Sequence, residues 1–149
     1  MNRNDIRNTL DEESVRLSKA LGQNLLHDQN VLRRIAKAAD LQEDDQVLEI
    51  GPGLGALTEH LLEAVNELTA IEKDQRLHKH LSKRFAGQDK LHLIHHDALK
   101  YFENLEVDWT NWKLVSNLPY SVASPLLVDL AAMPKGPQRL VVTVQWEVG

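Results

Sequence analysis

The stretch Glu49–Gly55, with the sequence Glu-Ile-Gly-Pro-Gly-Leu-Gly, constrains the fold more than any other part of this 149-residue chain. It follows Val47, Leu48 and Ile50, an apolar pattern typical of a short buried strand, and it runs into a segment from Ala56 that is predicted to be helical. Glycines in such a strand–turn–helix unit let the backbone approach a ligand closely, and the first helical amides point toward that ligand. The stretch therefore predicts a binding turn for an anionic or polar ligand.

Both dinucleotide-binding and methyltransferase folds use a glycine turn of this kind. Here the glycines are spaced G-x-G-x-G rather than G-x-G-x-x-G, and Glu49 stands two places before the first glycine. This form resembles motif I of the class I S-adenosylmethionine (SAM) methyltransferases, in which the turn faces the amino-acid end of the cofactor. The resemblance implies SAM as the cofactor, with Gly51 and Gly53 in its binding turn.

The composition predicts one ordinary globular domain, with 42% hydrophobic and 26% charged residues. No apolar run approaches the ~20 residues that span a bilayer, and the N-terminus lacks the apolar core of a signal peptide. The absence of cysteine fits a reducing cytoplasm. We therefore expect a cytoplasmic protein without a membrane partner. The net charge of -5 argues mildly against a nucleic-acid partner.

Strands and helices are predicted to alternate along the chain. Residues 1–18 are expected to form a flexible arm before a domain over 19–149. Helices are predicted over Gln29–Ala39, from Leu57 to about Asn66, from about Leu77 to Gly87, and over Pro125–Ala132, with Pro125 in a first turn. Strands are predicted up to Ile50 and over Leu68–Glu72, Leu91–Asp97, Lys113–Asn117 and Arg139–Gln145. This alternation is typical of an α/β fold with a mostly parallel sheet and helices on both faces.

Polar residues follow consecutive predicted strands, and ligands of open parallel sheets bind beyond the carboxyl ends of the strands. Glu72 follows the second strand and Asp97 the third. Glu72 lies 21 residues past Gly51, about the ~20-residue interval at which an acid meets ribose hydroxyls. Either acid could instead cap a turn or a helix, as Asp97 in particular could. Their occurrence at consecutive strand ends favours a shared ligand site.

The sequence Asn117-Leu118-Pro119-Tyr120, placed in a turn after the fourth strand, suits the binding of a planar amine. The Asn117 side-chain oxygen and a backbone carbonyl next to the proline can each accept a hydrogen bond from an exocyclic NH2 group. Two acceptors aim the lone pair of that nitrogen at a methyl sulfonium, and the ring of Tyr120 offers a stacking face. The alternative, a proline turn with a buried tyrosine, does not explain the position beside the predicted cofactor turn.

From about Lys19 to Val148 the chain is similar to the KsgA-type small-subunit (16S) rRNA adenine dimethyltransferases. The segments that carry the resemblance are Gly22–Asp28, Glu49–Gly55, Glu72, Asp97-Ala98, Asn117–Tyr120 and Val144–Val148. The resemblance implies a Rossmann-like SAM-dependent methyltransferase fold. It also implies that two adjacent adenosines of small-subunit rRNA, in the pre-30S ribosomal particle, each receive two methyl groups on the exocyclic amine. The target base would be splayed out of a loop into the pocket.

The resemblance also implies which residues form the site. Those expected at the cofactor are Asn24, Leu26, Gly51, Gly53, Glu72, Asp97, Ala98 and Asn117, with Glu72 at the ribose and Asp97 by the adenine. Those expected at the target amine are Asn117, Leu118, Pro119 and Tyr120. Three features depart from the family pattern: Leu25 replaces phenylalanine, Trp146 replaces a basic residue, and the chain ends after the fifth strand. We therefore expect an incomplete domain whose C-terminal helical part is absent.

Other functions remain open at this stage. A non-catalytic rRNA-binding or ribosome assembly factor would keep the fold without turnover, and a large-subunit rRNA adenine dimethyltransferase of the macrolide-resistance type is a close relative. An NAD-dependent oxidoreductase is disfavoured by the glycine spacing. The seven histidines show no metal-ligand spacing, so no metal is expected, and a monomer is expected. The basic run Lys79, Lys83, Arg84 and Lys90 is interpreted as a solvated helix face.

Overall fold

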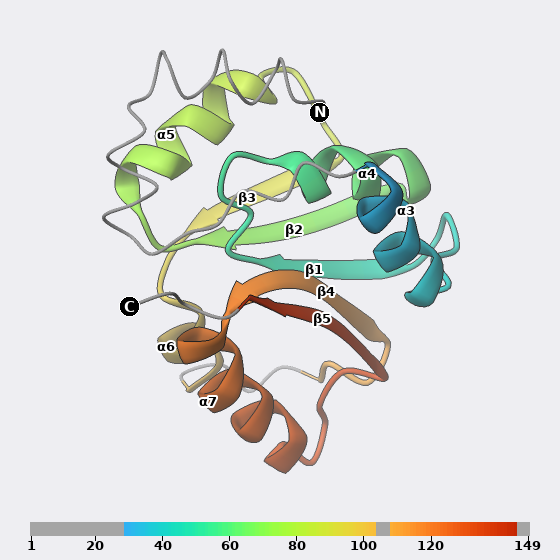
Figure 1. Ribbon diagram of the computed structural model, residues 1–149, viewed down its shortest axis with the longest axis vertical. Coiled ribbons are helices and arrows are strands. Elements are labelled where there is room, and N and C mark those ends of the chain that lie inside the picture. The colour runs from blue at the N-terminus through green and yellow to red at the C-terminus, as the bar shows by residue number, and fades with distance from the viewer. Residues whose placement is uncertain (1–28, 104–107, 146–149) are drawn as a thin grey trace.

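The computed structural model describes residues 29–103 and 108–145, in which strands and helices alternate (Figure 1). In chain order these elements are α3 (Gln29–Ala38), β1 (Gln46–Ile50), α4 (Ala56–Ala64), β2 (Glu67–Glu72), α5 (Gln75–Arg84), β3 (Leu91–His95), α6 (Ala98–Glu103), β4 (Trp112–Pro119), α7 (Tyr120–Ala132) and β5 (Arg139–Gln145). The arm predicted over residues 1–18 lies outside the described residues.

The strands form one parallel sheet in the order β3-β2-β1-β4-β5, which confirms the predicted fold class. The chain winds from β1 outward to β3 and then returns to the other side of β1 for β4 and β5. The order therefore reverses between β1 and β4, and such a reversal is where ligands of open α/β sheets bind.

The backbone ladder between β1 and β4 stops short of the carboxyl end of β1. Pairing of β1 with β2 continues to Ile50 opposite Ile71, whereas pairing of β1 with β4 ends at Leu48 opposite Leu114. Beyond that point the backbone amide of Ile50 donates to the buried hydroxyl of Ser116 over 2.8 Å. A side chain thus replaces the next backbone partner between these two strands at the switch point.

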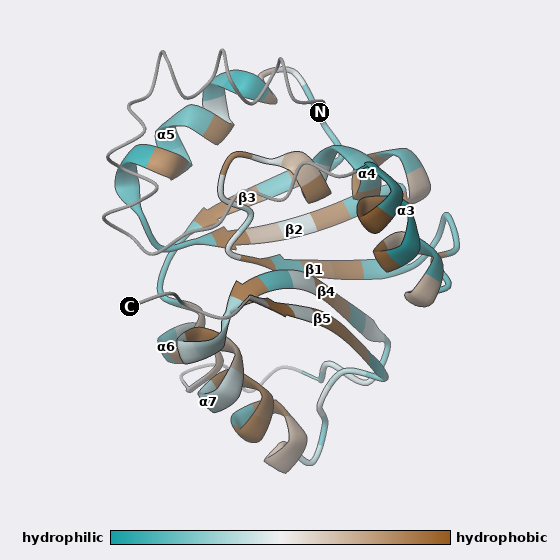
Figure 2. Ribbon diagram, viewed as in Figure 1, coloured by the Kyte–Doolittle hydropathy of each residue, from teal (hydrophilic) through white to brown (hydrophobic). Residues whose placement is uncertain are grey.

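Helices cover both faces of the sheet, as alternation predicted (Figure 1). On one face, α6 and α7 pack against alternate strand residues such as Leu48, Leu114 and Leu118. On the other face, α3 and α4 pack against Val47, Leu68 and their neighbours. Figure 2 shows hydrophobic residues concentrated in the strands and in α7, whereas α5 is mostly hydrophilic.

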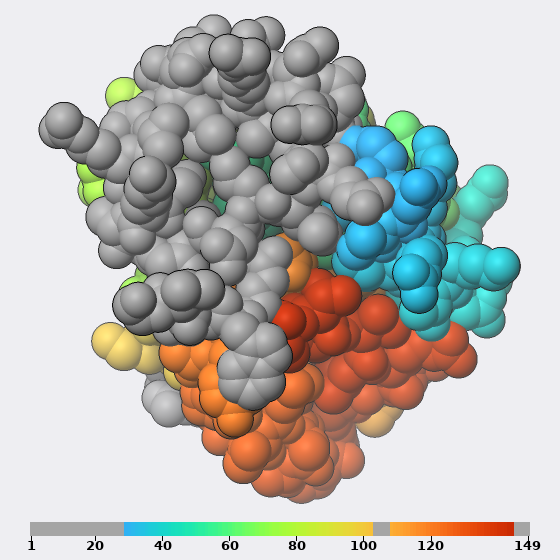
Figure 3. Space-filling view, in the orientation of Figure 1, coloured from blue at the N-terminus to red at the C-terminus, as the bar shows by residue number. Residues whose placement is uncertain are grey.

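Helix α3 also lies beside the last described strand. The guanidinium of Arg139 in β5 donates to the carbonyl of Ala38 over 3.2 Å, and Figure 3 shows blue α3 next to red β5 on one face of the molecule. This contact joins the beginning and the end of the described chain. Within the described residues, no helix combines the length and the apolar character needed to cross a membrane.

The structure corrects the ends of two predicted strands and adds one helix. The third strand ends at His95, and a helix that was not predicted, α6, follows Asp97. The fourth strand extends through Pro119, so Leu118 and Pro119 belong to β4 instead of to a turn after the predicted strand Lys113–Asn117.

Helix α7 begins at Tyr120, and Pro125 lies inside it, so its predicted place in a first turn is wrong. Ala123, Leu126 and Leu130 are buried along one face of α7, which extends the apolar stripe to both sides of the proline. Burial of this stripe offsets the loss of the backbone hydrogen bond that proline, which has no N–H group, cannot make.

Candidate cofactor and target-base site

The first glycine of the turn lies against the fourth strand. Gly51 has a φ of 65°, and its amide donates to the carbonyl of Ile71 over 2.9 Å. A Cβ atom added at Gly51 would lie 3.2 Å from Cδ2 of Leu118. Because this conformation is strained for other residues and the space is tight, glycine lets the turn contact the Asn-Leu-Pro-Tyr segment closely.

The end of the turn is held by α5. A Cβ atom at Gly55, whose φ is 94°, would lie 2.6 Å from Nη1 of Arg84 and 2.7 Å from Cε2 of Phe85. Arg84 donates from Nη1 to the carbonyl of Leu54 over 2.6 Å and from Nη2 to Oε2 of Glu59 over 3.1 Å. Its guanidinium also stacks 4.7 Å from the centre of the Phe85 ring. Arg84 is therefore a support for the turn, and its assignment to a solvated face was wrong.

Glu49 lies in β1 directly before the turn, and it is only 2% exposed. Its Oε1 accepts a hydrogen bond from the hydroxyl of Thr58 in α4 over 2.5 Å. Burial raises the pKa of Glu49 to about 8, and the nearby carboxyl of Glu72 adds to the rise. At neutral pH Glu49 is therefore mostly protonated, which suits a carboxyl placed inside the core.

Glu72, at the end of β2, meets the glycine turn directly. Its Oε1 accepts from the amide of Gly53 over 3.1 Å, and its Oε2 accepts from the amide of Asp74 over 2.9 Å. Burial raises its pKa, while these two backbone donors oppose the rise. A carboxylate has about four lone-pair sites, so both oxygens retain acceptor capacity for a ligand.

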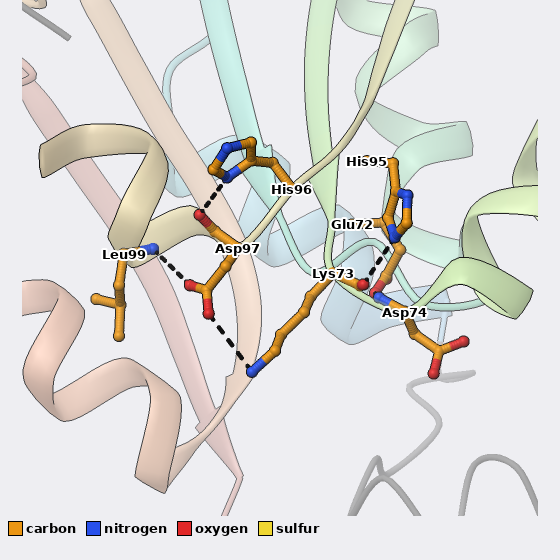
Figure 4. Close-up of polar contacts among 7 residues, drawn as sticks. All are labelled: Glu72, Lys73, Asp74, His95, His96, Asp97 and Leu99. Carbon is orange, nitrogen blue, oxygen red and sulfur yellow. Dashed lines mark hydrogen bonds and ion pairs between the residues drawn. The ribbon is translucent and has the colours of Figure 1, made fainter. Parts of the chain in front are cut away.

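Asp97 caps helix α6, one of the two roles that the sequence allowed for it. Its Oδ1 accepts from the amide of Leu99 over 3.0 Å at the start of α6, and its Oδ2 lies 3.5 Å from the ammonium of Lys73 (Figure 4). Ala98, the first residue of α6, is 8% exposed and packs in the core. The capping contact occupies one oxygen of Asp97, and the ion pair ties it to the loop after β2.

Two histidines contact backbone carbonyls at the same edge of the sheet. His95 contacts the carbonyl of Lys73 through Nε2 at 3.0 Å, and His96 contacts the carbonyl of Asp97 through Nδ1 at 2.9 Å (Figure 4). The first contact joins the loop after β2 to the end of β3. The second orders the connection into α6.

The Asn-Leu-Pro-Tyr segment divides between core and surface. Leu118 is 2% exposed and packs in the core, whereas Tyr120 is 47% exposed, so the alternative of a buried tyrosine is wrong. Pro119, at the N-cap of α7 with φ -59° and ψ 148°, ends the strand. Asn117 is half-buried, and its Oδ1 accepts from the hydroxyl of Thr143 over 2.7 Å.

The structure brings most of the predicted site residues to one edge. Gly53 bonds Glu72, Gly51 lies against Leu118, and Asp97 is tied to Lys73, the neighbour of Glu72. Asn24 and Leu26 lie outside the described residues, as do Leu25 and Trp146. Within residues 29–103 and 108–145, no three potential metal-ligating side chains gather.

Sequence reasoning missed two residues of this site, Arg84 and Thr143. Arg84 follows Leu77 and Leu81 at helical spacing, a signal that it borders the buried side of α5. Thr143 is the polar member of the aliphatic run Leu140–Val144, a signal that its hydroxyl has a specific partner.

Comparisons with known proteins identify relatives of one kind. A family model described as ribosomal RNA adenine dimethylase matches residues 15–149. The chain is 44% identical over 149 residues to the ribosomal RNA small subunit methyltransferase A of Corynebacterium diphtheriae, covering 97% of this chain and 50% of that protein. It is 40% identical over 144 residues to the protein of the same name from Clostridium acetobutylicum, covering 96% and 52%. The chain thus spans about half the length of these relatives.

Two solved structures share the fold. The 23S rRNA methyltransferase ErmE superposes with a TM-score of 0.69 at 29% identity, covering 82% of this chain and 48% of that one. A dimethyladenosine transferase from Plasmodium falciparum superposes with a TM-score of 0.68 at 30% identity, covering 82% and 43%.

Proposed function

The chain belongs to the ribosomal RNA adenine dimethylase family, and on this premise we propose that it forms the SAM-binding part of an rRNA adenine N6-dimethyltransferase. Its substrate would be two adjacent adenosines of small-subunit rRNA in the pre-30S particle. The contact between Gly51 and Leu118 carries the proposal, because it sets the cofactor turn directly against the segment that suits a target amine.

The residues at the carboxyl edge fit the cofactor. The Gly51–Gly55 turn has no side chain at the position nearest Leu118, so backbone can approach the amino-acid end of the ligand. Glu72 is held by two backbone amides with acceptor capacity left for ribose hydroxyls. Asp97 and Ala98 would border the adenine, and Asn24 and Leu26 are proposed to close over the cofactor. SAM, when bound, supplies a methyl group activated as a sulfonium.

The target base would be held by the end of β4. Oδ1 of Asn117 and the backbone carbonyl of Leu118 would accept the two hydrogens of its exocyclic amine, orienting the nitrogen lone pair. Pro119 keeps this segment stiff, and the exposed ring of Tyr120 offers a face for stacking. This arrangement suits a splayed, single-stranded adenosine and catalysis by positioning.

The names of the relatives favour small-subunit rRNA as the partner. Proteins 40–44% identical are named small subunit methyltransferases, whereas the 23S rRNA enzyme ErmE is 29% identical. We also propose that the protein is a cytoplasmic monomer. In this proposal the SAM-binding domain covers residues 19–149 and follows a flexible arm over residues 1–18.

Thermal unfolding of the 149-residue chain with SAM, and with NAD as the control, tests cofactor binding. We expect SAM alone to raise the melting temperature, because a ligand that binds only the folded state stabilises it. A shift with NAD instead would support the oxidoreductase alternative.

Methyl transfer to small-subunit precursor particles then tests the reaction itself. Asn117→Ala should abolish transfer while leaving binding of the RNA particle in place. A wild-type chain that binds SAM and the particle but transfers no methyl group would favour the assembly-factor alternative.

A further inference from the structure

We propose that Thr143 in β5 is a positioning residue that orients the side-chain amide of Asn117 toward the target amine. The inference rests on the proposed function for its role in methyl transfer. The contact that carries it is independent of that function: the Thr143 hydroxyl donates to Oδ1 of Asn117 over 2.7 Å.

The sheet register fixes this contact. Asn117 in β4 lies directly opposite Thr143 in β5, and register partners of neighbouring strands point to the same face. Both residues are half-buried. Because a β-branched threonine has a restricted χ1, its hydroxyl meets the asparagine from a fixed direction.

The asparagine needs such a restraint. The final torsion of an asparagine side chain is broad, so a free amide can turn either its oxygen or its NH2 group toward a ligand. An exocyclic amine donates two hydrogens, and an asparagine NH2 turned toward it would place donors against donors. The Thr143 hydroxyl occupies one lone pair of Oδ1 and holds the amide plane, while the second lone pair of Oδ1 is available to the substrate.

The composition of β5 supports a specific use of this hydroxyl. In the sequence of β5, Thr143 stands between aliphatic residues, which are Leu140, Val141, Val142 and Val144. Valine has the same shape and at least as high a preference for strands, so packing alone would be served by another valine. A hydroxyl at this one position is explained by its bond to Asn117.

The test compares Thr143→Val, which removes the hydroxyl at constant shape, with Thr143→Ser, which retains it. Thr69→Val is the matched control, because Thr69 is also half-buried in a strand, on β2. Nuclear magnetic resonance of the 149-residue chain measures the order parameter of the Asn117 side-chain NH2 group and the shift of its carbonyl carbon. Single-turnover methyl transfer to small-subunit precursor particles and SAM affinity are measured in parallel.

We expect Thr143→Val to lower the Asn117 order parameter, to move its carbonyl carbon signal, and to slow transfer between about threefold and about tenfold. SAM affinity should stay unchanged, and Thr69→Val should match the wild type. Thr143→Ser, which keeps the hydroxyl on a side chain with a freer χ1, should stay closer to the wild type than Thr143→Val does. Should Thr143→Val fail to fold, Thr143→Ala removes the same hydroxyl.

Two outcomes overturn the proposal: unchanged Asn117 signals in Thr143→Val, or signals in Thr143→Ser that are altered as much as those in Thr143→Val. If the wild type transfers no methyl group but Asn117 still responds to Thr143→Val, the proposed function fails and the orienting contact is supported.

Discussion

The backbone amide of Gly53 donates to Oε1 of Glu72 over 3.1 Å, which joins the turn after β1 to the end of β2. The other oxygen of Glu72 accepts from the amide of Asp74, so one carboxylate fixes two loops before any ligand arrives. Preorganisation of this kind lowers the ordering cost of binding.

The first prediction concerns this carboxylate. Glu72→Gln replaces one acceptor oxygen by an NH2 group that would face a backbone amide, and it removes the charge that ribose hydroxyls would contact. We expect SAM affinity, measured by isothermal titration calorimetry, to fall at least about tenfold. Glu67→Gln is the control, because Glu67 begins the same strand with a side chain that is 65% exposed. Equal affinities for wild type and Glu72→Gln would contradict a role in cofactor binding.

The second prediction concerns the pH dependence of stability. Because the folded pKa of Glu49 is about 8 and its ordinary value is 4.5, the unfolded chain ionises first as pH rises. The free energy of unfolding should therefore fall between about pH 4.5 and pH 8, by an amount on the order of a few kcal/mol. Glu49→Gln mimics the protonated form and should flatten this fall in urea unfolding curves.

Glu72 also has a raised pKa and contributes in the same direction, so some slope should remain in Glu49→Gln. The exposed Glu63 of α4 offers a control in Glu63→Gln, which should keep the full slope. Identical slopes for Glu49→Gln and the wild type would show that Glu49 does not carry the effect.

The third prediction concerns the support of the glycine turn. Arg84→Met keeps much of the aliphatic stem but removes the donors to Leu54 and Glu59. We expect it to weaken SAM binding and to lower the free energy of unfolding by about 1–3 kcal/mol, because the Leu54 carbonyl loses a charged donor. Lys83→Met, at the neighbouring exposed position, should change neither quantity. Similar losses in both variants would argue against a specific support by Arg84.

The fourth prediction concerns the amino ends of the strands. Lys113 in β4 is 8% exposed, and its ammonium donates to Oδ2 of Asp45 over 2.7 Å and to the carbonyl of Asp40 over 2.8 Å. Lys113→Met leaves the carboxylate of Asp45 without this partner, so chemical denaturation should show a loss of about 3–5 kcal/mol. Lys113→Met combined with Asp45→Asn should recover part of that loss.

The pKa of Asp45 provides a second measurement on the same pair. Burial alone would raise this pKa, but hydrogen bonds from Lys113 and Gln42 lower it below 3.8. The stability that Asp45 contributes is therefore present above its ordinary pKa and is lost as pH falls through the lower folded value. Lys113→Met should move the pKa upward in a nuclear magnetic resonance titration, and an unmoved pKa would contradict the assignment.

Local sequence patterns determined the class of fold and most of the site. Alternating strand and helix patterns predicted the parallel sheet, because each reports which side of a short segment is buried. The glycine spacing, Glu72 and Asn117 could be placed together, since carboxyl ends of parallel strands share one edge of a sheet. Helix α6 was missed because its six residues are too few to show a clear period.

Tertiary structure alone decided how the site is held together. The strand order, with its reversal between β1 and β4, was not predicted. The hydrogen bonds of Arg84 to Leu54 and of Thr143 to Asn117 were not predicted either. The first joins residues that lie 30 positions apart in the sequence, and the second joins residues 26 positions apart. Periodicity describes the surroundings of each segment separately, whereas these bonds depend on which segments become neighbours and in which register. The sequence by itself therefore determined the kinds of residue at the site, and the packing of the sheet decided their partners.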